Sequence, residues 1–238
     1  MKTASLLLAL MMIFTQSNGQ NLNSLFNKAR ESISGKPGAL SNEDIVSGLK
    51  EALVLGTEKG TTRLSQVDGF FADAALKILL PPEAKKIEEN FRKIGLGRQA
   101  DDAILSMNRA AEDACKTAAP IFAKAVKEMS IEDAVGILKG ADSAATIYLK
   151  NKTGRDLTDA FSPVVKSSLQ KVDATKYWGV FIANYNRFAL QKLNPDLTAY
   201  VTEKALAGIF SQIALEEKNI RRDPVARSSE ILKKVFGH

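Results

Sequence analysis

The chain has 238 residues, of which 45% are apolar and 25% charged; this excludes a disordered protein and provides a sizeable core. The formal net charge of +6 permits contact with anionic surfaces without requiring it, and no aromatic-rich basic motif indicates nucleic-acid binding. The only histidine is His238 and the only cysteine is Cys115, which excludes Ser-His-Asp and Cys-His triads, Cys/His zinc sites and an internal disulfide.

The first twenty residues have the order of a secretory signal peptide. Lys2 gives a positive start, Leu6–Phe14 is a run of nine apolar residues, and Ser17 and Gly19 are small residues at the −3 and −1 positions of a cleavage site. No cysteine near the cut could carry a lipid, and no later stretch reaches the about 18 apolar residues of a transmembrane helix. We therefore expect residues 1–19 to be removed and the mature chain to be periplasmic or secreted, without a transmembrane segment.

Residues 20–40 are polar and contain Gly35, Pro37 and Gly38, which is typical of a short helical piece followed by a linker. Apolar residues then recur at helical spacing to the end of the chain, and no run of alternating β-branched residues appears. We therefore expect one all-α domain over residues 41–238, a single-domain multi-helix bundle.

Caps and breaks divide this domain into helices. Capping-box sequences begin at Ser41 and Ser130, and Gly56–Thr62 is expected to break the first helix. The apolar segments expected to be helical are Ser41–Leu53, Val67–Leu80, Pro82–Arg92, Gln99–Ala118, Ile121–Met129, Ser130–Lys139, Ser143–Lys150, Leu157–Val172, Asp173–Leu193, Leu197–Arg221 (the longest) and a final segment from Asp223.

The two halves of the domain share a sequence pattern. Ser41–Ala52 and Ser130–Ala141 match at seven of twelve positions, and Asp68–Phe70 and Asp159–Phe161 follow at nearly the same offset. One hypothesis is an internal duplication of two helical halves. The other is that capping boxes and Leu-Lys pairs simply recur in helical proteins.

The predicted helix Gln99–Ala118 has polar residues at its apolar face. On a helical wheel of about 100° per residue, Asn108 falls on the core face and Glu112 on its shoulder. Cys115 shares the core face, which favours an inert buried thiol over a nucleophile.

The predicted helix Leu197–Arg221 is apolar almost all round, so Glu216 and Glu217 lie among positions expected to be buried. A buried carboxylate must be paired, hydrogen-bonded or protonated, and nearby arginines are suitable partners. The sequence therefore predicts a buried polar network of Asn108, Arg109, Glu112, Arg187, Glu216, Glu217, Arg221 and Arg222.

This network has two interpretations. In the first, it is an ion-pair network that fixes how the helices pack. In the second, Glu112 or Glu216 lines an open cleft and acts as a general acid on a cell-envelope glycan. The Glu-x-x-His pairs of a dinuclear metal site are absent, and no catalytic residue, metal or cofactor is assigned.

An aromatic stripe follows at helical spacing in Tyr177, Phe181, Tyr185 and Phe188, with Trp178 beside it. Such a stripe is typical of a core, and the alternative is the wall of an apolar ligand groove.

Several short segments together resemble a known family. They are Asn108–Glu112, Ala144–Tyr148, Tyr200–Leu206, Glu216-Glu217, Ile220-Arg221, Asp223-Pro224 and Val235–Gly237. In these segments the chain resembles a bacterial secreted family catalogued as domain of unknown function 4197, over about residues 38–237. The resemblance implies an exported, α-helical periplasmic protein of Gram-negative bacteria, and it brings no established activity, cofactor or catalytic residue.

Taken together, these patterns favour a non-catalytic binding or structural protein of the periplasm or cell envelope. The expected partner is an apolar ligand, an envelope component or another protein. The alternative is a hydrolase that acts on cell-envelope glycan through a buried glutamate. The two differ in geometry, because an enzyme needs Glu112 or Glu216 in an open cleft, whereas a structural network needs both closed off by arginines.

Overall fold

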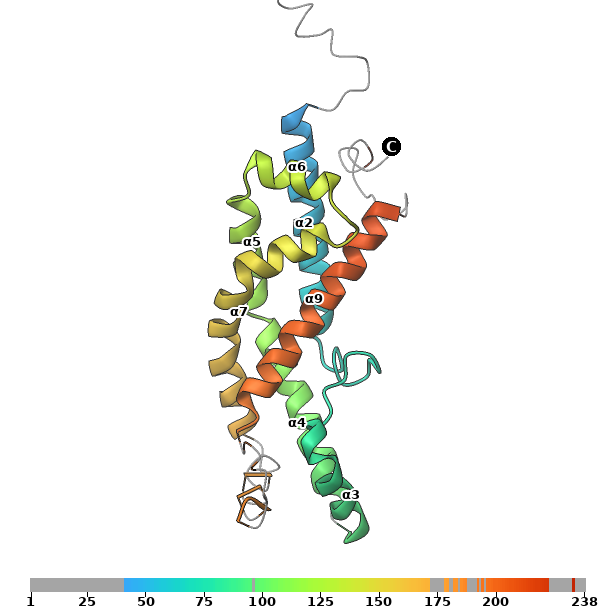
Figure 1. Ribbon diagram of the computed structural model, residues 1–238, viewed down its shortest axis with the longest axis vertical. Helices are drawn as coiled ribbons and strands as arrows, with labels where there is room; N and C mark the ends of the chain where they lie inside the picture. Colours follow the sequence, from blue (N-terminus) through green and yellow to red (C-terminus); the bar gives the residue numbers. More distant parts are fainter. Residues whose placement is uncertain are drawn as a thin grey trace, which may run out of the picture. The chain divides into compact units, whose positions relative to one another are not determined.

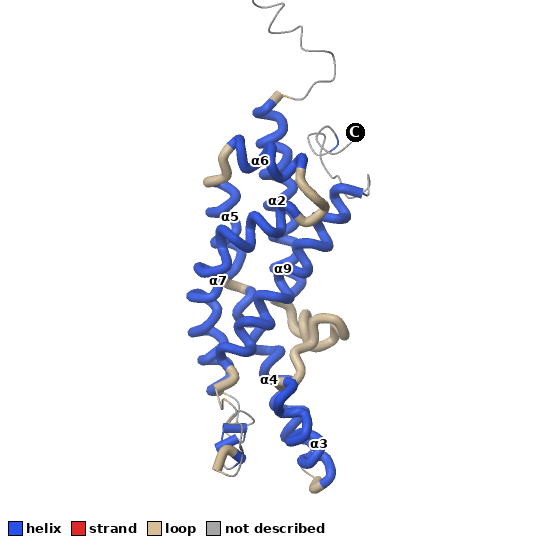
Figure 2. The backbone as a smooth tube through the Cα atoms, in the orientation of Figure 1, coloured by secondary structure: helices blue, strands red, loops and turns tan. Residues whose placement is uncertain are grey.

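The computed structural model describes residues 41–95, 97–171 and 196–222, together with residues 178–179, 182–183, 185–187, 192, 194 and 233. The chain divides into two units, Met1–Ser41 and Asn42–His238, and every described element belongs to the second. Each of these elements is a helix, and Figure 2 shows no strand among them. The predicted all-α fold is therefore confirmed, whereas the predicted signal peptide and linker lie outside the described residues.

The described helices follow one another in the order shown in Figure 1. They are α2 (Asn42–Leu64), the 3₁₀ helix η1 (Pro82–Ala84), α3 (Lys85–Lys93), α4 (Gly97–Cys115), α5 (Ala118–Lys127), α6 (Ile131–Lys139), α7 (Ala144–Gln170) and α9 (Thr198–Arg222). None of them combines the length and the apolar composition that crossing a bilayer requires.

Helix α9 packs against three other helices. It contacts α7, α2 and α4, and in Figure 1 it crosses them diagonally. Its buried residues include Val201, Ala205, Ile209 and Ile213, which repeat every four residues and so line one side of the helix. The sequence of α9 is apolar on most sides because three neighbouring helices cover it.

Helix α4 is buried along most of its length and contacts α7, α9 and α3. Its small side chains, such as Ala103, Ala110 and Ala114, let these helices approach closely. Cys115 at its end is buried, as the wheel predicted, and this burial raises the pKa of the thiol far above its ordinary value.

The stretch Gly56–Thr62 does not break the first helix, because α2 continues through it to Leu64. The prediction was wrong because these glycines are contact positions against α9. A Cβ atom on Gly56 would lie 3.6 Å from Cβ of Glu216, and one on Gly60 would lie 3.5 Å from Cβ of Gln212. Small residues at these positions therefore let the two helix backbones approach each other.

Helix α7 is one element of 27 residues where two shorter helices, Ser143–Lys150 and Leu157–Val172, were predicted. The polar sequence between them is a solvent-facing stretch of the same helix. Leu149, Thr153 and Leu157 are buried at four-residue spacing, and the Thr153 hydroxyl donates to the backbone oxygen of Leu149 at 2.7 Å. Helix α7, rather than the 25-residue α9, is the longest described helix.

The suggested internal duplication has no counterpart in the described helices. Ser130 does form a capping box, in which its hydroxyl accepts from the Asp133 backbone N–H at 3.1 Å. However, it precedes a helix of 9 residues, whereas Ser41 precedes one of 23. Likewise, Asp68–Phe70 forms turns between helices, while Asp159–Phe161 lies inside α7.

The remaining predicted helices, Asp173–Leu193 and the segment from Asp223, lie mostly or wholly outside the described residues. Two members of the aromatic stripe are described. Trp178 is buried, as a core residue would be, and Tyr185 is exposed. The other three members lie outside the described part of the chain.

Candidate functional site

Residues 65–81, here called the α2–η1 loop, form turns and an irregular stretch, so the helix predicted over Val67–Leu80 was wrong. Two residues near its start show how tightly the chain turns. Asp68 has a φ of 69°, which is outside the right-handed helical region. At Gly69 a Cβ atom would lie 2.6 Å from the backbone oxygen of Arg63, so no side chain fits there. The loop therefore leaves α2 through a tight turn.

Glu112 of α4 binds the backbone of this loop. Its Oε1 accepts the backbone N–H groups of Phe70 at 3.1 Å and Phe71 at 3.3 Å. Its Oε2 accepts from the guanidinium of Arg109 at 2.7 Å, and the same guanidinium donates to Asp68 at 2.6 Å. The Glu112 residue is only 3% exposed, so its carboxylate is closed off from solvent and occupied by structural contacts.

Asn108, one turn earlier on α4, binds the loop at a second point. Its Oδ1 accepts the backbone N–H of Ile78 at 2.9 Å, and its Nδ2 donates to the backbone oxygen of Ile78 at 2.8 Å. Nδ2 also donates to the backbone oxygen of Ile104 within α4 at 2.7 Å. Asn108 and Glu112 are here called the α4 clamp. Together they bind backbone atoms of the loop at two points, Phe70 and Phe71 at one and Ile78 at the other.

Glu217 of α9 forms a second, separate cluster. It accepts five hydrogen bonds: from the backbone N–H groups of Ala145 and Thr146, from the Thr146 hydroxyl, and twice from Arg221. Arg221 also donates to the backbone oxygen of Ile137 at 3.0 Å. Residues from α6, α7 and α9 are thus joined around one carboxylate, which has no lone pair left for chemistry.

The other predicted members of the network lie elsewhere. Glu216 pairs with Lys59 rather than with an arginine, at 2.7 Å, and its side chain is 13% exposed. Arg222 is exposed and pairs with Asp142. Arg187 is exposed, and no ion pair joins it to the three glutamates within the described residues. The structure thus separates the predicted network into two clusters and leaves Arg187, Glu216 and Arg222 outside both.

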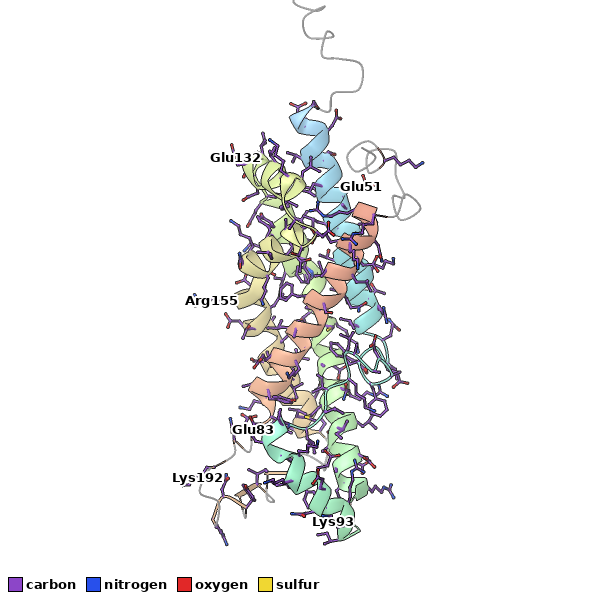
Figure 3. The ribbon with its side chains drawn as sticks, turned by 45° about the vertical axis from the view of Figure 1, so that its right-hand side comes forward. Glu51, Glu83, Lys93, Glu132, Arg155 and Lys192 are labelled. Atoms are coloured by element: carbon purple, nitrogen blue, oxygen red, sulfur yellow. The ribbon has the colours of Figure 1, made fainter. Side chains whose placement is uncertain are left out.

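An open groove of about 610 Å³, here called the α9 groove, lies along one side of α9. One wall is the face of α9, and the other is the end of the α2–η1 loop with the beginning of α3. Figure 3 labels Glu83, in the middle of η1, and Lys93, at the end of α3. The lining residues are Ala75, Leu76, Lys77, Ile78, Leu79, Leu80, Pro82, Lys85, Glu88, Tyr200, Lys204, Ala207, Gly208 and Ser211.

Two contacts join the walls of the α9 groove. The Tyr200 hydroxyl on α9 donates to the backbone oxygen of Leu79 at 3.0 Å. Further along α9, Gly208 packs against the buried ring of Phe70, because a Cβ atom there would lie 2.5 Å from a ring carbon. These contacts leave the Leu79 residue 56% exposed, so an aliphatic side chain faces solvent in the groove.

Three lysines line the α9 groove, and none of them forms an ion pair within the described residues. The Nζ of Lys77 lies 3.8 Å from the ring centre of Phe71, and that of Lys204 lies 5.5 Å from the ring centre of Tyr200. Lys85, on the first turn of α3, is exposed. The lining therefore carries positive charge that its own carboxylates do not neutralise.

The lining of the groove contains one acidic residue beside its three lysines. Glu88, the one carboxylate in the lining, pairs with Arg92 at 2.8 Å. Burial, together with the negative charges of Glu83 and Glu203, raises the pKa of Tyr200, and neither of these two glutamates lines the groove. Within the described residues, no group of three or more His, Cys, Asp or Glu side chains could hold a metal ion.

Sequence reasoning did not find the α9 groove. Its residues come from a loop, a short helix and α9, and nothing in their spacing along the chain links Leu79 to Tyr200. A partial signal was present in α9, where Lys204 and Ser211 interrupt the apolar pattern on one side. Only the packing of the loop beside α9 turns that polar interruption into a groove wall.

Comparisons with curated proteins and with solved structures each give no match. A comparison with family models gives one match, to the family described as "Protein of unknown function (DUF4197)", over residues 39–237. That range includes the α4 clamp, the Glu217 cluster and the α9 groove. The chain belongs to this family of proteins of unknown function.

Proposed function

We propose that this protein is an exported, non-catalytic binding protein of the cell envelope, and that the α9 groove is its ligand site. One observation carries the proposal: an open groove of about 610 Å³ has aliphatic walls, of which Leu79 is exposed, and lysines without carboxylate partners. Small-molecule sites commonly occupy about 300–1,000 Å³ and combine apolar walls with a few polar groups. The groove has that size and that composition.

The contacts of Glu112 and Glu216 favour a binding role over glycan hydrolysis. A glycan hydrolase would need a carboxylic acid in an open cleft to protonate the leaving oxygen. Glu112 is closed off by two backbone N–H groups and Arg109, and Glu216 is paired with Lys59. Neither lines the α9 groove, whose single carboxylate, Glu88, is paired with Arg92. No observation favours the hydrolase over the binding protein.

Export to the envelope is supported by residues 1–19. Lys2, the apolar run Leu6–Phe14, and the small residues Ser17 and Gly19 occur in the order that signal peptidase substrates require. A binding protein in the envelope would meet apolar and anionic envelope components there.

The binding role is tested with the neutral apolar dye Nile red, whose fluorescence rises on transfer to an apolar site. The mature protein is expected to bind the dye saturably. Ala207→Trp places an indole on the exposed α9 wall of the groove and should abolish that binding. Ala123→Trp, at an exposed position of α5 outside the groove, is the matched control and should bind like the wild type.

Circular dichroism of both variants establishes that they are folded. The proposal fails if the wild-type protein shows no saturable binding, or if Ala207→Trp and Ala123→Trp bind the dye equally well.

A further inference from the structure

The chemistry of the α9 groove restricts what can occupy it. The walls facing the open space include Leu76, Leu79 and Pro82 on the loop side and Ala207 on α9. Covering the exposed Leu79 side chain removes apolar surface from water, which favours binding. The part of a ligand that lies along these walls should therefore be a hydrocarbon.

The charges give the second restriction. Lys77, Lys85 and Lys204 line the groove, and no carboxylate of the described residues pairs with any of them. Glu88, the one acid in the lining, is already held by Arg92. An occupant with a negative group would supply the missing partner, because charge-assisted hydrogen bonds form where an anion meets an ammonium.

We infer that the α9 groove binds a long-chain carboxylate, with its hydrocarbon chain along the aliphatic walls and its carboxylate among the lysines. This inference rests on the proposed function and names its ligand class. An ammonium is a compact point charge that pairs with a carboxylate without fixing its orientation. No arginine, whose planar fork would hold a carboxylate or a phosphate in one fixed orientation, lines the groove.

Other occupants match fewer of these features. A small inorganic anion would pair with the lysines but leave Leu79 uncovered. A neutral hydrocarbon would cover Leu79 but would give the three ammonium groups no anionic partner. An acidic peptide would have to place an acidic and an apolar side chain at a fixed spacing, and the groove presents no regular array of backbone groups to set that spacing.

The first experiment is calorimetric titration of the mature protein with dodecanoate, below its micelle concentration. Two matched ligands separate the two restrictions: dodecan-1-ol has the chain without the charge, and acetate has the charge without the chain. We expect saturable binding of dodecanoate, weaker binding of dodecan-1-ol and no measurable binding of acetate. Raising the salt concentration to about 1 M should weaken only the dodecanoate interaction, because it screens exposed charges.

The second experiment removes the charges. The double variant Lys85→Gln/Lys204→Gln should bind dodecanoate about tenfold more weakly and bind dodecan-1-ol as the wild type does. The matched control is Lys86→Gln/Lys218→Gln, which changes exposed lysines of the same two helices outside the groove. It should change dodecanoate affinity by less than about twofold.

The outcomes separate the ligand class from the proposed function. If Nile red binds the groove but dodecanoate neither binds nor displaces it, the carboxylate inference is wrong and the binding role stands. The carboxylate inference is also wrong if both lysine double variants bind dodecanoate equally, or if an acidic peptide displaces the dye and dodecanoate does not. If Nile red itself does not bind, the proposed function fails as well.

Discussion

The carboxylate of Glu217 accepts both the backbone N–H of Thr146 at 2.9 Å and its hydroxyl at 2.8 Å, across 71 residues of sequence. Thr146 lies in the first turn of α7, where backbone N–H groups have no partner within the helix. Ser143, the residue at the N-cap position, makes no side-chain hydrogen bond there. Helix α7 is therefore capped by α9, so a tertiary contact does what a local cap normally does.

The cap makes Glu217→Ala a strongly destabilising change. It would leave the buried N–H groups of Ala145 and Thr146 without an acceptor and would remove the carboxylate that accepts two hydrogen bonds from Arg221. We expect the free energy of unfolding to fall by about 3–5 kcal/mol. Chemical denaturation followed by circular dichroism measures it.

The adjacent Glu216→Ala is the matched control for this change. It removes only an ion pair with Lys59, whose side chain is 68% exposed, and should cost less than about 1 kcal/mol. An equal decrease in the free energy of unfolding in the two variants would contradict the capping role of Glu217.

Glu112→Ala should loosen the α2–η1 loop. Two consecutive backbone N–H groups, those of Phe70 and Phe71, lose their acceptor, at a cost of about 1–3 kcal/mol for each group left unsatisfied. Hydrogen exchange measured by mass spectrometry should be faster in peptides that contain these two residues. The control Glu89→Ala, at an exposed position on α3, should leave that exchange unchanged. Unchanged protection in Glu112→Ala would show that the loop does not depend on the clamp.

Two glycine substitutions should have opposite effects. Gly208→Ala places a Cβ atom 2.5 Å from the buried Phe70 ring and should destabilise the protein by about 1–3 kcal/mol. Gly136→Ala on α6 meets no atom within 4 Å and should stabilise it by about 0.4–1 kcal/mol, because alanine restricts the unfolded chain. Thermal melting of both variants tests this, and a stabilised Gly208→Ala variant would mean that α9 does not pack closely on Phe70.

Cys115 should react slowly with a thiol reagent in the folded protein and rapidly in urea. Burial raises the pKa of its thiol above the ordinary value of 9.0, so the folded state favours the protonated form. Above about pH 9 the unfolded thiol ionises while the folded one stays protonated, so this group's contribution to stability falls as the pH rises. Cys115→Ala should therefore show a shallower loss of stability than the wild type between about pH 8 and pH 10. Labelling of the native protein at the denatured rate would contradict the burial.

Export predicts a mature protein that begins at Gln20. Amino-terminal sequencing of the extracytoplasmic fraction should find this residue within one or two positions, because Ser17 and Gly19 are the small residues that flank the cut. Gly19→Arg should block cleavage, whereas Thr15→Ser should not. Recovery of the intact chain starting at Met1 from the cytoplasm would contradict export.

Sequence patterns correctly predicted features that depend on residues close together in the chain, such as a helix cap and the buried face of a helix. The capping box at Ser130 and Asp133 and the buried face containing Cys115 follow from spacing alone. Gly56 and Gly60 were misread, because a glycine at a close helix contact looks the same in sequence as a glycine that ends a helix. The contacts of Asn108 and Glu112 with a loop 30 to 42 residues away, and of Glu217 with α7, depend on tertiary packing that no local pattern encodes.

The α4 clamp fixes the position of the loop wall of the α9 groove without using the loop's side chains. Asn108 and Glu112 bind only backbone atoms of the loop, at Ile78 and at Phe70 and Phe71. Side chains such as Ala75 and Leu79 can therefore be replaced by others during evolution while the same four hydrogen bonds keep the wall in place. The ligand preference proposed for the α9 groove could therefore change through substitutions of a few loop residues, without any change to the helices that hold the loop.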